Sequence, residues 1–194
     1  MFSMRYLLSA PTISGLPEDV GAEVAFWGRS NAGKSTLLNV LSGQKKLARV
    51  SKRPGCTRMM NIFSLAEDVR LVDFPGYGYA RASKVEQARW LDCMIHYIDC
   101  RQSLRGIVLI MDVRHPFQSN DMAVLAHLLE AELPICLVLN KIDQLKTNAL
   151  VKQRTKFKDH PVFSSPNVQV CWLSAFKKKN VDELASILSG WLDE

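Results

Sequence analysis

Apolar residues follow two different spacings along this chain, and the two spacings alternate from the first quarter of the sequence to its end. Short apolar runs, which are typical of buried strands, lie near residues 23–27, 61–66, 69–73, 106–112, 135–139 and 168–173. Segments with apolar residues three and four positions apart, which are typical of helices, lie near residues 34–43, 84–101, 119–131, 147–158 and 180–192.

Alternating strands and helices predict an α/β fold in three layers, with a mostly parallel sheet and helices on both of its faces. Only Glu67 and Asp68 separate the second and third predicted strands. This connection is short enough for a hairpin, so it predicts one antiparallel edge strand. In the last helix the apolar residues form one stripe, which we expect to face the core. They are Val181, Leu184, Ile187, Leu188 and Trp191.

The composition is that of one globular domain. The chain has 194 residues, of which 47% are hydrophobic and 23% are charged, and this is enough to form a sizeable core without disulfides. We expect a single domain over residues 23–194, preceded by an ordered lead-in over residues 1–22 that packs on it. Pro11 and Pro17 argue against one long helix in that lead-in.

Cysteine usage and hydropathy favour a cytoplasmic protein. No apolar run approaches the length of a membrane span, so we expect no membrane contact. The five cysteines are odd in number and never form C-x-x-C, which indicates a reducing compartment. Cys136 and Cys171 fall in predicted strands and are expected to be buried free thiols. Neither the cysteines nor the four histidines have the spacing of a zinc site. Nothing in the sequence requires more than a monomer.

A glycine-containing segment after the first predicted strand matches the phosphate-binding pattern G-x-x-x-x-G-K-[ST]. Its residues are Gly28, Arg29, Ser30, Asn31, Ala32, Gly33, Lys34 and Ser35. In such a loop backbone N–H groups surround the phosphates, Lys34 contacts the outer phosphates, and Ser35 ligates Mg²⁺. The segment therefore predicts that the chain binds a nucleoside polyphosphate with Mg²⁺. By itself it does not distinguish a kinase from an ATPase or a GTPase.

A second segment, Asn140-Lys141-Ile142-Asp143, indicates the base. It follows the predicted strand 135–139 and so lies at the carboxyl end of a strand, where open α/β sheets bind ligands. The Asp143 carboxylate can accept hydrogen bonds from the ring N–H and the amine of guanine, whereas adenine would leave it unpaired. We expect Asn140 and Lys141 to support the pocket, and Ile142 is a further predicted contact residue. Backbone N–H groups after the strand 168–173 are expected to meet the guanine carbonyl. They belong to Leu173, Ser174 and Ala175.

Between these two segments, Asp73-Phe74-Pro75-Gly76 fits the D-x-x-G element that senses the third phosphate. Asp73 would hold Mg²⁺ through water, and the Gly76 N–H would contact the γ-phosphate. The loop beyond Gly76 could then be ordered by GTP and released on hydrolysis. Thr57 lies after the first helix and before the next strand, where it is the candidate second Mg²⁺ ligand. The predicted ligands are GTP or GDP with Mg²⁺, and a nucleoside kinase would leave the Asn140–Asp143 segment unexplained.

The order of these segments resembles a translation-factor-class GTPase, and longer strings resemble the EngB family of bacterial GTP-binding proteins. The strings are EVAFWGRSNAGKS at 23–35, DFPGYGYA at 73–80 and MDVRHP at 111–116. The resemblance implies the P-loop GTPase fold and a role in assembly of the large ribosomal subunit, with an older link to cell division and septation. It also implies that a first-switch segment contacts the nucleotide. That segment contains Gly55, Cys56, Thr57, Arg58 and Met59.

Two positions depart from the family pattern. Cys56 stands where the family usually has arginine, so the contact that this arginine would make in the first switch is not expected to carry over unchanged. Asn140 stands where many members have threonine, and asparagine is the usual residue of GTPases at this position.

The residue after Gly76 bears on catalysis. Ras-like proteins have a glutamine there that orients the attacking water, whereas this chain has Tyr77. We therefore predict slow intrinsic hydrolysis, stimulated by a partner or by K⁺, with Lys34, Thr57 and Gly76 as the catalytic groups. Asn31 matches the position that potassium-activated relatives use to hold K⁺, but the alternative is that it only tightens the loop. Hydrolysis rates in K⁺ and in Na⁺ would distinguish the two.

The net charge of +6, from 25 Lys and Arg against 19 Asp and Glu, is concentrated in three places. These are Lys45, Lys46, Arg49, Lys52 and Arg53 near the first switch, Lys152, Arg154, Lys156 and Lys158 on one helix, and Lys177, Lys178 and Lys179 after the base segment. A GTP-ordered basic segment is a physical route to RNA affinity, because phosphate contacts dominate such binding. The helix has the alternative of being a solvated face.

The sequence thus predicts a GTP-binding switch that contacts the large ribosomal subunit or its precursor through ribosomal RNA, and no DNA. Two alternatives stay open. One is an RNA-binding module gated by GTP without functional turnover. The other is a cell-division regulator that acts through protein partners.

Overall fold

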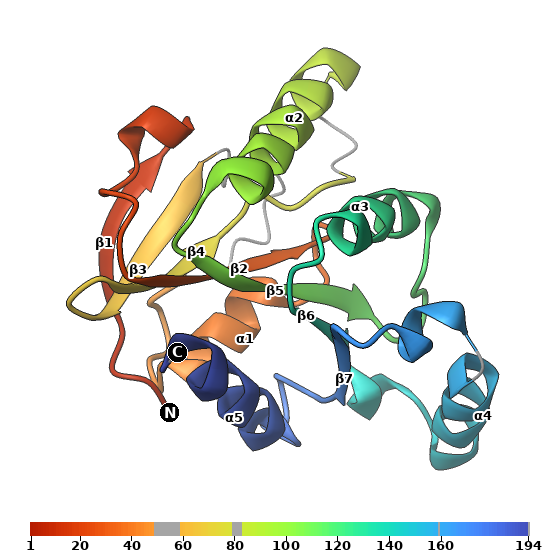
Figure 1. The fold of residues 1–194 in the computed structure, drawn as a ribbon. Coiled ribbons are helices and arrows are strands. Elements are labelled where there is room, and N and C mark those ends of the chain that lie inside the picture. Colours follow the sequence, from red (N-terminus) through yellow and green to blue (C-terminus); the bar gives the residue numbers. More distant parts are fainter. Residues whose placement is uncertain (49–58, 79–82, 159, 194) are drawn as a thin grey trace.

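One seven-stranded sheet forms the centre of the molecule (Figure 1). The structure is a computed structural model that describes residues 1–48, 59–78, 83–158 and 160–193. Within these residues the strand order is β1-β3-β4-β2-β5-β6-β7. The strands are β1 (Arg5–Ala10), β2 (Ala22–Gly28), β3 (Met60–Ala66), β4 (Val69–Asp73), β5 (Leu104–Asp112), β6 (Ile135–Asn140) and β7 (Val168–Trp172). From β4 to β7 the neighbours pair in parallel, and β3 is antiparallel to both β4 and β1.

Helices cover both faces of this sheet (Figure 1). Helices α1 (Lys34–Leu41) and α5 (Val181–Leu192) share one buried apolar cluster with the sheet, and α2 (Lys84–Cys100) and α3 (Ser119–Glu130) share the other. Helix α4 (Thr147–Lys158) lies beyond β6 and β7 and has one buried residue, Phe157. Three short 3-10 helices complete the described chain, namely η1 (Ile13–Gly15), η2 (Ile142–Gln144) and η3 (Pro161–Ser164). The predicted three-layer α/β fold is confirmed.

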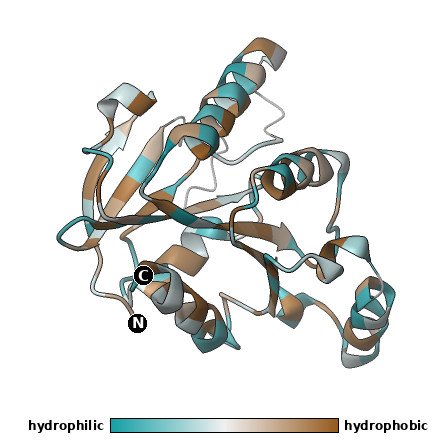
Figure 2. Ribbon diagram, in the orientation of Figure 1, coloured by the Kyte–Doolittle hydropathy of each residue, from teal (hydrophilic) through white to brown (hydrophobic). Residues whose placement is uncertain are grey.

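The core follows from the alternation of side chains along the strands. In β2, Val24 and Phe26 join the cluster under α1 and α5, whereas Ala25 and Trp27 join the cluster under α2 and α3. Figure 2 shows the apolar residues concentrated in the central strands. The stripe predicted for the last helix also faces the core. Val181, Leu184, Leu188 and Trp191 are buried, and Ile187 is half-buried against the same cluster.

Strand β1 is the element that the sequence pattern did not predict. It adds to the outer side of β3, so the one antiparallel strand is the second from the edge of the sheet. Three of its six residues are exposed, and its register shifts between Tyr6 and Leu8. A short, half-exposed strand with an irregular register has little periodicity for a sequence pattern to reveal. The sequence pattern therefore assigns these residues only to an ordered lead-in.

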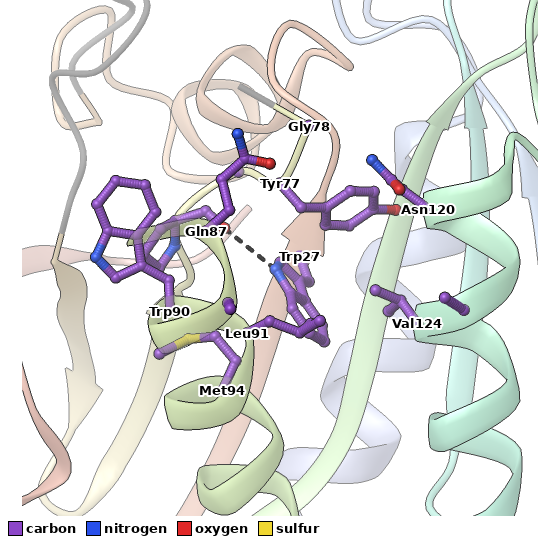
Figure 3. A pocket seen from close by; sticks show the side chains of 13 residues that line it. Trp27, Tyr77, Gly78, Gln87, Trp90, Leu91, Met94, Asn120 and Val124 are labelled. Carbon is purple, nitrogen blue, oxygen red and sulfur yellow. Dashed lines mark hydrogen bonds between the residues drawn. The ribbon is translucent and has the colours of Figure 1, made fainter. Parts of the chain in front are cut away.

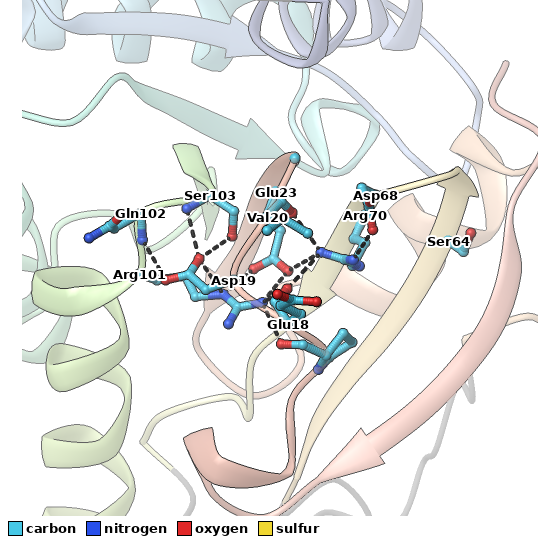
Figure 4. Close-up of polar contacts among 12 residues, drawn as sticks. Glu18, Asp19, Val20, Glu23, Ser64, Asp68, Arg70, Arg101, Gln102 and Ser103 are labelled. Atoms are coloured by element: carbon cyan, nitrogen blue, oxygen red, sulfur yellow. Dashed lines mark hydrogen bonds and ion pairs between the residues drawn. The ribbon is translucent and has the colours of Figure 1, made fainter.

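A buried charge network holds the lead-in and the end of α2 to the amino-terminal end of β2 (Figure 4). The Glu23 carboxylate, 1% exposed, accepts hydrogen bonds from Arg101 at 2.7 and 2.9 Å, from Arg70 at 3.2 Å and from the Tyr97 hydroxyl. Asp19 accepts the Ser103 N–H at 2.9 Å. Burial and the nearby Glu23 carboxylate raise the pKa of Tyr97 well above its ordinary value, so its hydroxyl keeps its proton. The network fixes one end of α2, and the other end of the helix begins near the site described below.

Cys136 of β6 and Cys171 of β7 are fully buried, as predicted, and their Sγ atoms lie 3.6 Å apart without a disulfide. Among the described helices, none combines the length and the apolar character needed to cross a bilayer.

Candidate nucleotide-binding site

The loops predicted to contact a nucleotide lie together at one end of the sheet. Gly28 ends β2, Asp73 ends β4, Asp112 ends β5 and Asn140 ends β6, and in the parallel part of a sheet these carboxyl ends share one edge. β2 lies between β4 and β5, and the helices that follow β2 and β4 pack on opposite faces. This is the topological switch point at which open α/β sheets bind ligands.

The phosphate loop depends on glycine at position 33. Gly33 has a φ of 103°, in the left-handed region, and immediately precedes α1. A Cβ there would lie 2.2 Å from Nδ2 of Asn140, so space and backbone conformation both require glycine. No side chain caps the amino-terminal end of α1. The first N–H groups of the helix therefore form the kind of end that binds an anion.

A buried ion pair lies between Lys34 of α1 and Asp73 at the end of β4. The two residues are 9% and 3% exposed. The Asn61 side-chain amide donates to the other Asp73 oxygen at 3.3 Å. Each of the two buried charges neutralises the other, which removes much of the cost of burying either one alone.

The segment after Asp73 is bonded along β2 and the phosphate loop. Phe74 N–H donates to the Phe26 carbonyl at 2.9 Å, and Tyr77 N–H donates to the Gly28 carbonyl at 3.3 Å. In return, Ser30 N–H donates to the Tyr77 carbonyl at 2.9 Å. The loop that begins at Asp73 and contains the predicted γ-phosphate sensor Gly76, called the sensor loop below, is therefore joined to the phosphate loop by backbone hydrogen bonds.

Gly76 and Tyr77 are held differently. A Cβ on Gly76 would lie 3.2 Å from the Ser30 nitrogen, so this glycine permits the close approach of the two loops. The Tyr77 hydroxyl donates to Asp121 of α3 at 2.8 Å, and its ring packs edge-on against Trp27 at a centroid distance of 5.7 Å. Burial and the Asp121 carboxylate raise the pKa of Tyr77 above its ordinary value. The phenol is thus bound to α3.

Asn140 joins three loops. Its Nδ2 donates to the Ala32 carbonyl at 2.9 Å, and its Oδ1 accepts Lys141 N–H at 2.8 Å and Ala175 N–H at 3.0 Å. The side chain is 2% exposed. One asparagine thus connects the phosphate loop to both base-side loops, which are the loop after β6 (residues 140–143) and the loop after β7 (residues 173–175).

Lys141 makes a second connection between the base-side loop and the phosphate loop. Its Nζ donates to the Asn31 carbonyl at 2.6 Å and to Asp112 at 2.9 Å. Arg114 also donates to Asp112, at 2.6 and 2.9 Å. Burial opposes ionisation of Asp112, but the hydrogen bonds from Arg114 and Lys141 outweigh it and hold the pKa of Asp112 well below its ordinary value.

The two base-side loops meet at Asp143. The buried Ser174 hydroxyl donates to one Asp143 oxygen, and the Gln144 side chain donates to the other at 2.7 Å. Burial opposes ionisation here too, but these hydrogen bonds outweigh it and lower the pKa of Asp143. The carboxylate is therefore ionised at neutral pH and able to accept hydrogen bonds.

Most of the other predicted contact residues fall into three groups. Ser35 is half-buried in the first turn of α1, and Met59 is 40% exposed just before β3. Gly55, Cys56, Thr57 and Arg58 lie outside the described residues. The side chains of Phe74, Ile142 and Leu173 are buried in the core, and their backbone N–H groups donate to the carbonyls of Phe26, Leu173 and Leu139.

Three residues that sequence reasoning did not assign also shape the site. Asp112 orients Lys141, and an acid at the end of strand 106–112 was the available signal. Asp121 caps α3 by accepting Gln118 N–H at 2.9 Å and also holds Tyr77. Asn39 makes two hydrogen bonds with the backbone of Ala48, the last described residue before the first switch. The sequence contains no indication of this pairing, because neither residue belongs to a recognised motif.

The phosphate loop, sensor loop and base-side loops together define the class of P-loop GTPases, and comparisons with known proteins agree. The profile of the 50S ribosome-binding GTPase family matches residues 23–141. A probable GTP-binding protein EngB of Edwardsiella ictaluri is 43% identical over 190 residues, which cover 98% of this chain and 88% of the relative. A probable EngB of Pasteurella multocida is 44% identical over 187 residues, covering 96% and 91%.

Solved structures show the same fold. A crystal structure of a probable GTP-binding protein EngB has a TM-score of 0.70 and 26% identity, and the match covers 89% of this chain and 99% of that one. Era, in complex with MgGDPNP and a segment of 16S ribosomal RNA, has a TM-score of 0.67 and 26% identity, covering 89% and 57%. The chain belongs to the EngB family of GTP-binding proteins.

The Asn140 junction leads to a prediction about stability without nucleotide. Asn140→Ala leaves the carbonyl of Ala32 and the N–H groups of Lys141 and Ala175 without this partner, and we expect it to lower the free energy of unfolding by about 3 kcal/mol. Urea unfolding of the nucleotide-free protein measures the change. Asn148→Ala, at an exposed position of α4, is the control and should change it by less than about 0.5 kcal/mol. A loss below about 1 kcal/mol for Asn140→Ala would contradict the junction.

Proposed function

We propose that this chain is a guanine-nucleotide switch of the cytoplasm that binds GTP with Mg²⁺, hydrolyses it slowly and acts in assembly of the large ribosomal subunit. The nucleotide part of the proposal rests mainly on the junction at Asn140, whose side chain is hydrogen-bonded both to Ala32 of the phosphate loop and to Ala175 of the loop after β7. A switch needs its phosphate-sensing and base-reading parts fixed relative to one another, and this junction does that.

The donor set at the phosphate end fits Mg²⁺ and phosphate. Ser35 offers a half-buried hydroxyl and Asp73 a carboxylate, and Mg²⁺ prefers such oxygen ligands. We assign Ser35 and Thr57 as direct ligands and Asp73 as a ligand through water, with Lys34 on the outer phosphates. A bound Mg²⁺ would neutralise phosphate charge. The chain itself would orient the phosphates with the N–H groups of the loop and exclude water by closing Gly76 onto them.

The base end fits guanine. Asp143 is held ionised beside Ser174, and the backbone of Lys141 is fixed by Asn140. The N–H groups of residues 173–175 donate within the chain, so a guanine carbonyl would have to displace one of their acceptors. We assign Asp143 to the ring N–H and amine of guanine. Adenine presents an acceptor and a C–H at these positions, so it would leave the carboxylate unpaired.

Slow hydrolysis follows from the position of Tyr77. Its hydroxyl is bonded to Asp121, 2.8 Å away, and so it points to α3 and does not replace a water-orienting amide. A partner, or a K⁺ ion held at Asn31, would then have to supply the missing stabilisation of transition-state charge. Asn31 has a φ of 66°, which also suits the alternative in which it only shapes the loop.

The base assignment is tested by Asp143→Asn. The amide cannot accept from both donors of guanine, but its N–H can donate to the carbonyl that xanthine carries in place of the amine. We expect the affinity for GDP to fall by at least about 100-fold and the affinity for XDP to exceed it, as measured by calorimetry. Gln144→Ala is the control, because it removes one hydrogen bond to Asp143 and leaves the carboxylate in place. Retained preference for GDP in Asp143→Asn would remove Asp143 from the pocket.

The ribosomal part of the proposal is supported from three directions. The matching family profile is described as that of 50S ribosome-binding GTPases, and the structurally similar Era was solved with ribosomal RNA. The chain has a net charge of +6. A basic protein whose loops respond to GTP is suited to nucleotide-controlled binding of an RNA-rich particle.

This part is tested by sedimentation with ribosomal particles at two salt concentrations, with GDP or a non-hydrolysable GTP analogue bound. We expect co-migration with large subunits or their precursors in the GTP-like state, and less of it at the higher salt concentration because phosphate contacts are screened. The GDP-loaded protein is the matched control. Absence from every particle in both states would contradict the ribosomal role and favour action through division proteins.

A further inference from the structure

A cavity of about 150 Å³ lies between α2 and α3, next to the sensor loop (Figure 3). Trp27, at the end of β2, lies between the two helices, and its indole N–H donates to the Pro75 carbonyl at 3.1 Å. On the α2 side lie Leu91 and Met94, and on the α3 side lies Val124. The fourth side is the loop from Pro75 to Gly78.

Small side chains leave this space open. Ala88 of α2 and Ala123 of α3 both line the cavity and have only one methyl group each. Larger apolar residues at either position would reach further into the gap. Both alanines are exposed, so the cavity has access to solvent between them.

The lining chemistry selects for a neutral aromatic ligand. Thirteen of the described residues line the cavity, and none of them has a charged side chain. An ionised ligand would lose its hydration there without gaining a counter-charge from these residues. The rings of Trp27, Tyr77 and Trp90 and the thioether of Met94 offer edge-to-face and sulfur–aromatic contacts. The Asn120 carboxamide provides a hydrogen-bonding group within the same lining.

The volume sets the size of the ligand. Apolar cavities of roughly 150 Å³ accept benzene in engineered proteins. We propose that the cavity between α2 and α3 binds a neutral aromatic molecule of one ring, and that its occupancy is coupled to the nucleotide state. Such a ligand would contact Trp27 and Tyr77 together and would add a third ring to their edge-to-face pair.

The coupling is expected because one residue belongs both to the cavity lining and to the loop beside the nucleotide site. Tyr77 lines the cavity and is also bonded to Gly28 and Ser30 of the phosphate loop. A ligand that favours one position of this loop must change nucleotide affinity by the same factor by which the nucleotide changes the affinity for the ligand. The coupling rests on the proposed function, whereas binding of the ring does not.

The test uses benzyl alcohol as the neutral probe and benzoate as its charged counterpart. Chemical shifts of the Trp27 indole N–H and the Met94 methyl group report occupancy. In the nucleotide-free protein we expect saturable binding of benzyl alcohol in the roughly millimolar range, and at least about tenfold weaker binding of benzoate. The affinity for benzyl alcohol should differ at least about twofold between the GDP state and the GTP-analogue state.

Two variants fill the cavity. Ala88→Phe and Ala123→Phe each bring a ring to its lining, and we expect at least one of them to abolish the saturable shifts. Ala149→Phe, on the exposed surface of α4, is the matched control and should leave them unchanged. Non-saturable shifts, equal binding of benzoate, or binding that persists in both filled variants would overturn the site. Equal affinity in the two nucleotide states would overturn the coupling alone, and failure of the protein to bind any nucleotide would instead count against the proposed function.

Discussion

The organisation of the site depends on the buried ion pair between Lys34 and Asp73. A single charge at either position, 9% and 3% exposed, would cost several kcal/mol without its partner. Phosphate and Mg²⁺ offer replacements of opposite sign, because phosphate can neutralise Lys34 while the cation neutralises Asp73. Both charges can then change partners without either being left unpaired. We expect this exchange to make binding of phosphate and of metal depend on each other.

A change of partner at Asp73 could also affect more distant parts of the structure through the chain that follows it. The chain after it is bonded by its backbone to Phe26, Gly28 and Ser30, and Tyr77 continues the connection to Asp121 of α3. The far end of α2 is fixed through Glu23. A shift of Asp73 would therefore be expected to act on the space between α2 and α3, next to Tyr77. The proposed coupling between the cavity and the nucleotide relies on this connection.

The sequence predicted most of the fold because its apolar spacing is strong where burial is complete. Every predicted strand and helix is present within a few residues, since β2, β5 and β6 are almost entirely buried and leave unbroken apolar runs. The sequence pattern did not predict β1, because half of this strand is exposed and its pairing partner, β3, lies some fifty residues further along the chain. Patterns local in sequence do not report such pairing.

The site was predictable to the same extent. Motifs placed the phosphate, sensor and base-side loops at one edge, and the structure brings them together there. The motifs did not reveal which side chains connect the loops. Asp112 orients Lys141 and Asp121 holds Tyr77 only because β5 and α3 lie beside those loops in space. Such partners depend on tertiary packing, so the spacing of residues in the sequence does not predict them.

A calorimetric titration of GDP and ADP, with and without Mg²⁺, tests directly whether a guanine nucleotide takes over the partners of Lys34 and Asp73. We expect GDP to bind, ADP at the same concentrations not to bind, and GDP binding to weaken strongly in Lys34→Ala. Equal binding of ADP, or unchanged GDP affinity in Lys34→Ala, would contradict it.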